Sequence, residues 1–199
     1  MVTPNIAFHT HTALAAGLRE LLKQLEDRLA LATPLTMYLA GGMAVHLYTA
    51  ARVTTDVDAE YSARVNIPDD VMVTVNLEDG TPQVIYLDKN YNASFALMHD
   101  DYQHDSVPVN LGRLQHVAVR VLQPVDLAVS KIARLANNDR DDIASLVRLG
   151  LTNADEIEQR ATAAIAGFVG GRSSLLLNLK DALSLARNIQ TERDRDTQR

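Results

Sequence analysis

The stretch LAGGMAVHLYTAARVTTDVDAEYS (residues 39–62) decides how the rest of this chain is interpreted. A short apolar run leads into Gly41-Gly42, a helix-permissive segment follows, and a strand-like segment then carries Asp56 and Asp58. In a strand, residues two positions apart point to the same face, with α-carbons about 6.5–7 Å apart. Two like charges this close raise each other's pKa unless a cation binds between them. The stretch therefore predicts either a metal site or the solvated face of a strand.

The context of the two carboxylates favours the metal site. Backbone N–H groups at a Gly-Gly turn and at the start of a helix can bind phosphate oxygens. Magnesium prefers oxygen ligands and takes one or two protein carboxylates together with phosphate oxygens. Two such ions held by shared carboxylates are the usual arrangement for in-line phosphoryl transfer. An isolated D-x-D on a wet strand face, holding nothing, is the alternative.

The composition is that of an ordinary globular protein. The 199 residues are 47% hydrophobic and 22% charged, which predicts one domain, or one domain with a helical annex. The sequence contains no run of about 18 apolar residues, so we expect no membrane span. Its start lacks the basic and apolar regions of a secretory signal. It contains no cysteine, hence no disulfide and no thiolate zinc site. These features predict a cytoplasmic location.

The net charge of -6 is unevenly distributed. Residues 1–110 hold 6 Lys and Arg against 14 Asp and Glu, whereas residues 111–199 hold 13 against 11. A broad contact with a phosphate backbone depends on clustered Lys and Arg. The acidic first half therefore disfavours long DNA as a partner and favours cation binding.

Hydrophobic periodicity divides the chain into a mixed part and a helical part. In the first part it predicts an amphipathic helix at 12–31, a short helix at 43–51, strands at 35–40, 53–62 and 116–122, a short strand in SVPVNL, and a hairpin over 71–88. After Pro124 it predicts helices at 125–138, 140–150, 153–170 and 174–189. We therefore expect an α/β fold, α+β in strict usage, with a mixed sheet flanked by helices. The expected boundaries are a core at 1–123, a helical part at 124–190 and a polar tail at 191–199.

Two blocks of the sequence carry a family resemblance. AGG (40–42) followed by TDVD (55–58) resembles the hG[GS]…DhD hallmark of the DNA polymerase β-like nucleotidyltransferase superfamily. The longer stretch GGMAVHLYTAARVTTDVD is similar to the pattern of the AbiEii/MenT-type nucleotidyltransferase toxins and of a neighbouring bacterial family of unknown function. PVDLAVSKIARLANNDRDDIASL (124–146) resembles a second block of the same group. The resemblance implies a nucleotidyltransferase-type sheet over roughly residues 35–150.

The resemblance also implies roles for individual residues: Gly41, Gly42 and Arg52 for nucleotide binding, Asp56 and Asp58 as ligands of Mg²⁺, Lys131 for contact with the triphosphate of an NTP, and Asp139 as a downstream catalytic aspartate followed by Asp142. The chain departs from the family pattern at two points. Asn138 stands where a basic residue is usual, and a third metal carboxylate is identified only as a candidate, Asp88. The corresponding position in SVPVNL is Asn110.

Several of these residues also have purely structural interpretations. Lys131 lies in an apolar helical segment, from which its side chain could reach solvent. Asp139 and its acidic neighbours could stabilise a helix N-terminus, which is the positive end of the helix dipole. His46 is more typical of a hydrogen-bonded structural histidine than of an acid or base. His9 and His11 have no evident third metal ligand and are expected to be exposed.

Three functional hypotheses remain open from the sequence. The first is a Mg-dependent nucleotidyltransferase whose acceptor is RNA such as tRNA, a protein or a small molecule, acting as a toxin or phage-defence component with a cognate antitoxin. The second is a degenerate nucleotidyltransferase fold that binds a protein partner. The third is modification of a small molecule such as a cationic antibiotic, which the acidic first half could attract.

Overall fold

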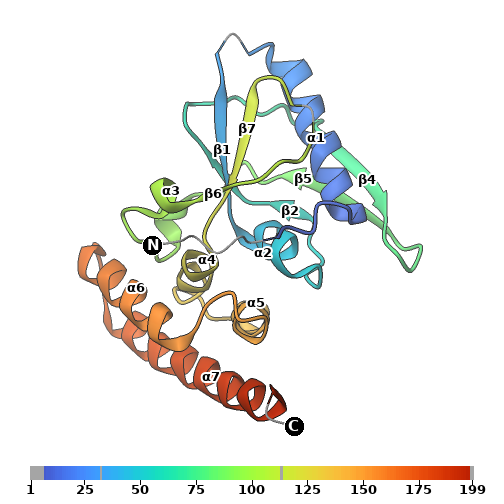
Figure 1. Ribbon diagram of the computed structural model, residues 1–199. Helices are drawn as coiled ribbons and strands as arrows, with labels where there is room; N and C mark the ends of the chain where they lie inside the picture. Colours follow the sequence, from blue (N-terminus) through green and yellow to red (C-terminus); the bar gives the residue numbers. More distant parts are fainter. Residues whose placement is uncertain (1–6, 32, 113, 198–199) are drawn as a thin grey trace. The chain divides into compact units, whose positions relative to one another are not determined.

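The computed structural model describes residues 7–31, 33–112 and 114–197, and these form two compact units. The first unit comprises the chain up to Tyr91 together with Ser106–Val121. The second comprises Asn92–Asp105 and the chain from Leu122 onward. The first unit holds all the strands of the described chain and two helices, and the second is helical (Figure 1). The expected α+β fold with a helical C-terminal part is confirmed.

The strands of the first unit form two small mixed sheets that share one continuous segment. The strands are β1 (Leu35–Leu39), β2 (Asp56–Val57), β3 (Ala59–Tyr61), β4 (Met72–Asn76), β5 (Pro82–Leu87), β6 (Val107–Pro108) and β7 (Val117–Val121). One sheet has the order β3-β1-β7-β6 and the other β2-β5-β4. Only Asp58 separates β2 from β3, so the predicted strand 53–62 passes from one sheet to the other at this residue.

The backbone bonds around Asp58 define its position. The carbonyl of Val57 accepts a hydrogen bond from the N–H of Asp88, just after β5, at 3.1 Å. The carbonyl of Asp58 accepts one from the N–H of Ala40, just after β1, at 2.9 Å. Successive carbonyls of an extended chain point in opposite directions. Asp58 therefore lies between the end of β1 on one side and the end of β5 on the other.

Two helices complete the first unit. Helix α1 (Ala13–Leu29) is capped by the Thr12 side chain and packs its leucine face on β4 and β5. Gly17 allows this close approach, because a Cβ there would lie 2.4 Å from Val75 Cγ1. Helix α2 (Gly41–Thr49) begins at the first glycine of the Gly-Gly pair, two residues before the predicted start. Both glycines thus form the first turn of a helix.

The second unit consists of η1 (Ala93–Phe95), α3 (Tyr102–Asp105), α4 (Pro124–Ser130), α5 (Asn137–Arg148), α6 (Ala154–Gly167) and α7 (Ser173–Thr197). In Figure 1, α6 and α7 run side by side. Asn153 caps the N-terminus of α6, because its side chain accepts a hydrogen bond from the N–H of Glu156. Helix α7 continues to Thr197, through most of the stretch predicted as a polar tail. In the described part of the chain, no helix is long and apolar enough to cross a membrane.

The predicted helix 125–138 is confirmed only up to Ser130, as α4, because the chain breaks between α4 and α5. Leu135 adopts a left-handed conformation with φ 50°, which no continuous α-helix accommodates. Its side chain is buried. Beyond the break, Asp139 accepts a hydrogen bond from the N–H of Ala136 and so begins a new helix. Periodicity alone could not reveal the break, because both halves are helical.

A buried ion pair holds α4 to α6. Arg160 donates to both carboxylate oxygens of Asp126, at 2.7 and 2.9 Å, and to Asp105 at 2.8 Å. Burial raises the pKa of the Asp126 carboxyl even though Arg160 binds it. Asp126 is the aspartate of PVDL, at the start of the second sequence block, and its contacts give it a structural role.

Replacing Tyr61 by phenylalanine is expected to leave stability unchanged or to raise it by about 1 kcal/mol. Within the described residues, the buried Tyr61 hydroxyl has no hydrogen-bond partner, and burial raises its pKa. The change removes an unsatisfied polar atom and keeps the ring. Urea denaturation measures the effect, and a loss of more than about 1 kcal/mol would show that the hydroxyl has a partner after all.

Candidate functional site

The two carboxylates of the D-x-D segment have different surroundings. The Asp56 carboxylate accepts a hydrogen bond from the Thr54 hydroxyl at 2.7 Å. The Asp58 carboxylate lies against Gly41, at the N-terminus of α2. A helix N-terminus favours negative charge, because its first N–H groups are unpaired and the helix dipole is positive there. The Asp58 carboxylate, a possible metal ligand, thus lies at a helix N-terminus, which favours the binding of anions.

The glycine pair is required by the close approach of the D-x-D segment. Gly41 has φ +61°, and a Cβ on it would lie 1.8 Å from Asp58 Oδ2. A Cβ on Gly42 would lie 2.9 Å from the Thr54 hydroxyl oxygen and 3.4 Å from Arg52 Nε. Both glycines therefore have a packing reason that does not depend on a phosphate. Gly41 and Gly42 are themselves buried.

Replacing Gly41 by alanine is expected to destabilise the protein by about 2–3 kcal/mol, the sum of left-handed strain and overpacking. The new alanine Cβ would overlap the Asp58 side chain. It would lie 2.6 Å from Cγ and 2.8 Å from Cβ of Asp58, both shorter than a normal contact. Gly80 is the matched control, since it too has positive φ but a Cβ there meets nothing within 4 Å. Urea denaturation of both variants isolates the overlap. Equal losses in the two variants would contradict it.

The candidate third carboxylate lies beside Asp58 in the backbone register. Val57 pairs with Leu87, so the next residues along the two parallel strands are Asp58 and Asp88. The Asp88 side chain accepts a hydrogen bond from the N–H of Asn90. Among the described residues, no group of three or more His, Asp or Glu side chains is arranged to hold a metal ion. A site for magnesium with two protein carboxylates needs the remaining ligands from phosphate and water, which is a common arrangement for this ion.

Four charged residues of the second sequence block form one network in the second unit. Lys131 Nζ lies 2.9 Å from Asp142 Oδ2 and 3.8 Å from Asp139 Oδ1. Arg134 donates two hydrogen bonds to Asp139, at 2.8 and 2.9 Å. The side chains of Asp139 and Asp142 are each only 2% exposed and that of Lys131 is 11% exposed. The network joins the end of α4 to the start of α5 and leaves the Lys131 side chain largely buried.

The pKa of Asp139 reflects this network. Burial raises the pKa of the carboxyl, but the hydrogen bonds from Arg134 and from the N–H of Ala136, together with the charge of Lys131, outweigh it. The pKa therefore lies below its ordinary value, and the carboxylate is ionised at neutral pH. An ionised carboxylate held by two cations is suited to orienting Lys131.

His46 has the structural role that the sequence favoured. It is 4% exposed, and its Nδ1 lies 2.7 Å from the Arg52 carbonyl oxygen. Because a carbonyl only accepts, Nδ1 carries the proton, and Nε2 accepts from the Thr12 hydroxyl at 2.7 Å. Neutral His46 therefore connects the cap of α1 to the segment that leads into β2.

Stability is expected to fall with acidification below about pH 6.5 because of His46. Burial lowers the pKa of His46, and the charge of His9 lowers it further, whereas the hydrogen bond to the Arg52 carbonyl raises it. Between that lowered pKa and the ordinary value, the unfolded chain binds more protons, so the free energy of unfolding decreases as pH falls. Urea denaturation across this range should show a shallower pH dependence for His46→Gln. The exposed His116→Gln is the control, and an unchanged slope in His46→Gln would contradict the account.

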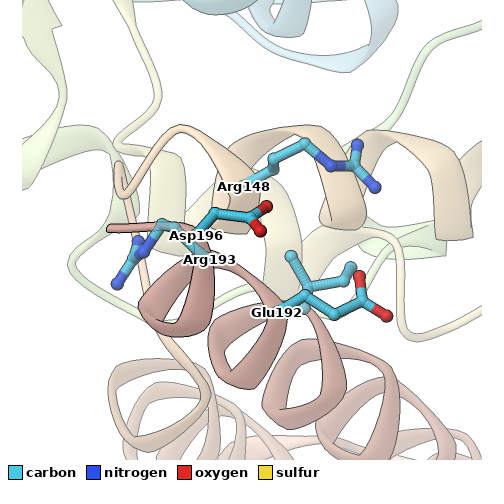
Figure 2. A pocket seen from close by; sticks show the side chains of 5 residues that line it. Arg148, Glu192, Arg193 and Asp196 are labelled. Atoms are coloured by element: carbon cyan, nitrogen blue, oxygen red, sulfur yellow. The ribbon is translucent and has the colours of Figure 1, made fainter. Parts of the chain in front are cut away.

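A separate pocket of about 300 Å³ lies between the end of α5 and α7 (Figure 2). Its lining residues are Arg148, Ile189, Glu192, Arg193 and Asp196. Two arginines are balanced by two carboxylates, and Arg193 also donates to the Val147 carbonyl. None of the predicted site residues lines this pocket. Its charge balance favours no class of ligand.

The predicted site residues fall into two groups, one in each unit. Gly41, Gly42, Arg52, Asp56 and Asp58 lie together in the first unit, around the start of α2 and β2. Lys131 and Asp139 lie together in the second unit. Arg134 and Thr54 were not among the predicted site residues, although they contact Asp139 and Asp56. The signal for Arg134 was its place in KIAR (131–134), within the second sequence block.

Comparison with known families gives a match that includes all of these residues. A family model described as "Nucleotidyltransferase of unknown function (DUF6036)" matches residues 16–181. The match spans both sequence blocks and both groups of site residues. No curated protein matches the chain.

Proposed function

The chain belongs to this nucleotidyltransferase family, and on that premise we propose that it transfers a nucleoside monophosphate from an NTP to an acceptor hydroxyl, releasing pyrophosphate. The observation that carries the proposal is the contact between the Asp58 carboxylate and Gly41. It brings a metal-type ligand to the anion-binding end of α2, which is what a metal-bound triphosphate requires.

The proposed roles in the first unit follow from the position of each residue, and the role of Lys131 follows from the family resemblance. The first N–H groups of α2 would bind phosphate oxygens. By the resemblance, Lys131, which Asp139 and Asp142 bind, would supply positive charge to the triphosphate. Asp56 and Asp58 would hold Mg²⁺, which neutralises phosphate charge and lowers the pKa of the acceptor hydroxyl. The acceptor oxygen bonds to the α-phosphorus as the bond to the pyrophosphate oxygen breaks, and the hydroxyl proton passes to water. Positioning and electrostatics supply the acceleration.

The biological setting is a further part of the proposal. The similarity of residues 41–58 and 124–146 to AbiEii/MenT-type toxins supports a role as a toxin or phage-defence component with a cognate antitoxin. A cysteine-free bacterial protein of this kind would act in the cytoplasm.

A degenerate fold that binds a protein partner is the second candidate. One observation favours it: the described His, Asp and Glu side chains include no three-ligand metal group. In that case the Lys131 network would serve the fold alone. A stable complex with a partner protein, together with no NTP binding, would support this candidate.

Label transfer tests the proposed reaction. The protein is incubated with Mg²⁺ and each NTP, labelled either at the α- or at the γ-phosphate, in the presence of cellular RNA, protein or small molecules. Nucleotidyl transfer predicts that the α-label enters an acceptor and that the γ-label leaves as pyrophosphate. Transfer of the γ-label would indicate a kinase instead, and no transfer with any NTP would contradict the proposal.

A further inference from the structure

We propose that the acceptor binds on the exposed face of the β2–β5–β4 sheet and that it is a small hydroxyl-bearing organic cation. This surface, called the acceptor face below, is defined by Asp56, Met72, Val84, Tyr86 and Asp88. The inference rests on the proposed function, since it concerns the second substrate of the same site.

The strand register places these residues on one face. Asp56 is paired with Tyr86, and Tyr86 is paired in turn with Met72. Residues paired across neighbouring strands point to the same side, about 5 Å apart. A row of side chains thus runs from the Asp56 carboxylate to the Tyr86 ring and then to the Met72 thioether. Val84 and Asp88 flank Tyr86 at two-residue spacing and share its face.

The exposure of this row is unusual for apolar side chains. Met72 is 52% exposed, Tyr86 43% and Val84 40%. The alternate residues of the same strands, such as Ile85, are buried on the side that packs on α1. The sheet therefore has a complete core on one side and uncovered aromatic and apolar groups on the other. Such a surface beside a candidate catalytic carboxylate is typical of a substrate-binding site.

The direction of in-line attack indicates that this face binds the acceptor and not the NTP. The acceptor must attack from the side opposite to the leaving pyrophosphate. The proposed phosphate site is the start of α2, and Ala40 there bonds to Asp58 from one edge of its strand. Asp88 and β5 bond to the other edge, through the Val57 carbonyl. The acceptor face is on this second edge, opposite the phosphates.

Charge decides the chemical class of the acceptor. The hairpin 71–88 contains Glu78, Asp79 and Asp88 and has no Lys or Arg. A polyanion such as RNA would be repelled by it, since RNA binding depends on basic residues. An organic cation is attracted by the carboxylates and by the face of the Tyr86 ring. These observations favour a small cationic acceptor over tRNA.

Methionine methyl resonances test this proposal directly. The protein is labelled with ¹³C at the methionine methyls and titrated with choline, with its uncharged isostere 3,3-dimethylbutan-1-ol, and with a short single-stranded RNA. We expect choline to shift the Met72 methyl and to leave those of Met37 and Met43 unmoved, because both are fully buried. The isostere and the RNA should have at least about tenfold weaker effects.

Two variants locate the binding. Tyr86→Ala should weaken the choline response at Met72 about tenfold. Leu177→Ala, which removes an exposed apolar side chain from α7, should leave the response unchanged. No choline shift, an equal shift with the isostere, a stronger shift with RNA, or an unchanged response in Tyr86→Ala would overturn the proposal. NTP and Mg²⁺ binding is measured separately, so a shift without NTP binding would refute the proposed function and keep the cation site.

Discussion

Replacing Lys131 by methionine is expected to lower the free energy of unfolding by about 3–5 kcal/mol. Methionine retains the apolar stem but removes the charge that lies 2.9 Å from Asp142. The Asp142 side chain is 2% exposed, so water cannot replace the lost partner. Urea denaturation measures the loss, and a cost below about 1 kcal/mol would show that the pair is solvated.

The double variant Lys131→Met with Asp142→Leu separates stability from function. Removing both charges leaves no unpaired ion, so most of the lost stability should return. NTP binding should not return, because the cation proposed to contact the triphosphate is still absent. Wild-type NTP affinity in the folded double variant would show that Lys131 has only a structural role.

Replacing Asp56 or Asp58 by asparagine is expected to reduce nucleotidyl transfer about 10³-fold, or about 4 kcal/mol in the activation barrier. Each change removes the charge of a proposed Mg²⁺ ligand and keeps its shape. The Thr54 hydroxyl can still donate to an amide oxygen at position 56, so the local fold should persist. Initial rates of α-label transfer measure the effect.

Asp27→Asn is the matched control for these two variants. It removes one negative charge, by the same chemical change, from an exposed position on α1 in the same unit. Its transfer rate should equal that of the wild type. If Asp27→Asn loses as much activity as Asp56→Asn, then general electrostatics rather than metal binding explains the loss.

The sequence predicted the strands and helices well where their patterns are local. Hydrophobic periodicity located α1 and α6, and the alternation of apolar and polar residues located the β4–β5 hairpin. Each of these signals depends on residues within a few positions of one another. Elements with such signals could therefore be predicted without knowledge of the fold.

The break between α4 and α5 could not be predicted in this way. It depends on the left-handed conformation of Leu135 and on the side chain of Asp139, which begins the next helix. The pattern there suits one helix as well as two. Likewise, the short elements η1 and α3 lie in an Asn- and Asp-rich stretch without periodicity.

The sequence predicted which residues belong to the candidate site better than it predicted the contacts between them. The pairing of two glycines with D-x-D was visible, but the clash between a Cβ at Gly41 and the Asp58 carboxylate is a property of the folded backbone. Lys131 was open to interpretation as a lysine that reaches solvent, whereas its side chain is 11% exposed and bound to two aspartates. Such partners lie eight or more residues apart, where sequence spacing gives no direct distance.

A calorimetric titration with NTP tests whether Asp56 and Asp58 hold the Mg²⁺ that NTP binding requires. The wild-type protein is titrated with each NTP in the presence of Mg²⁺ and again in the presence of a chelator, and the Asp56→Asn, Asp58→Asn double variant is treated in the same way. The account predicts binding of at least one NTP that requires Mg²⁺ and is lost in the folded double variant. Equal binding by the wild type and the double variant, or no binding of any NTP by the wild type, would contradict it.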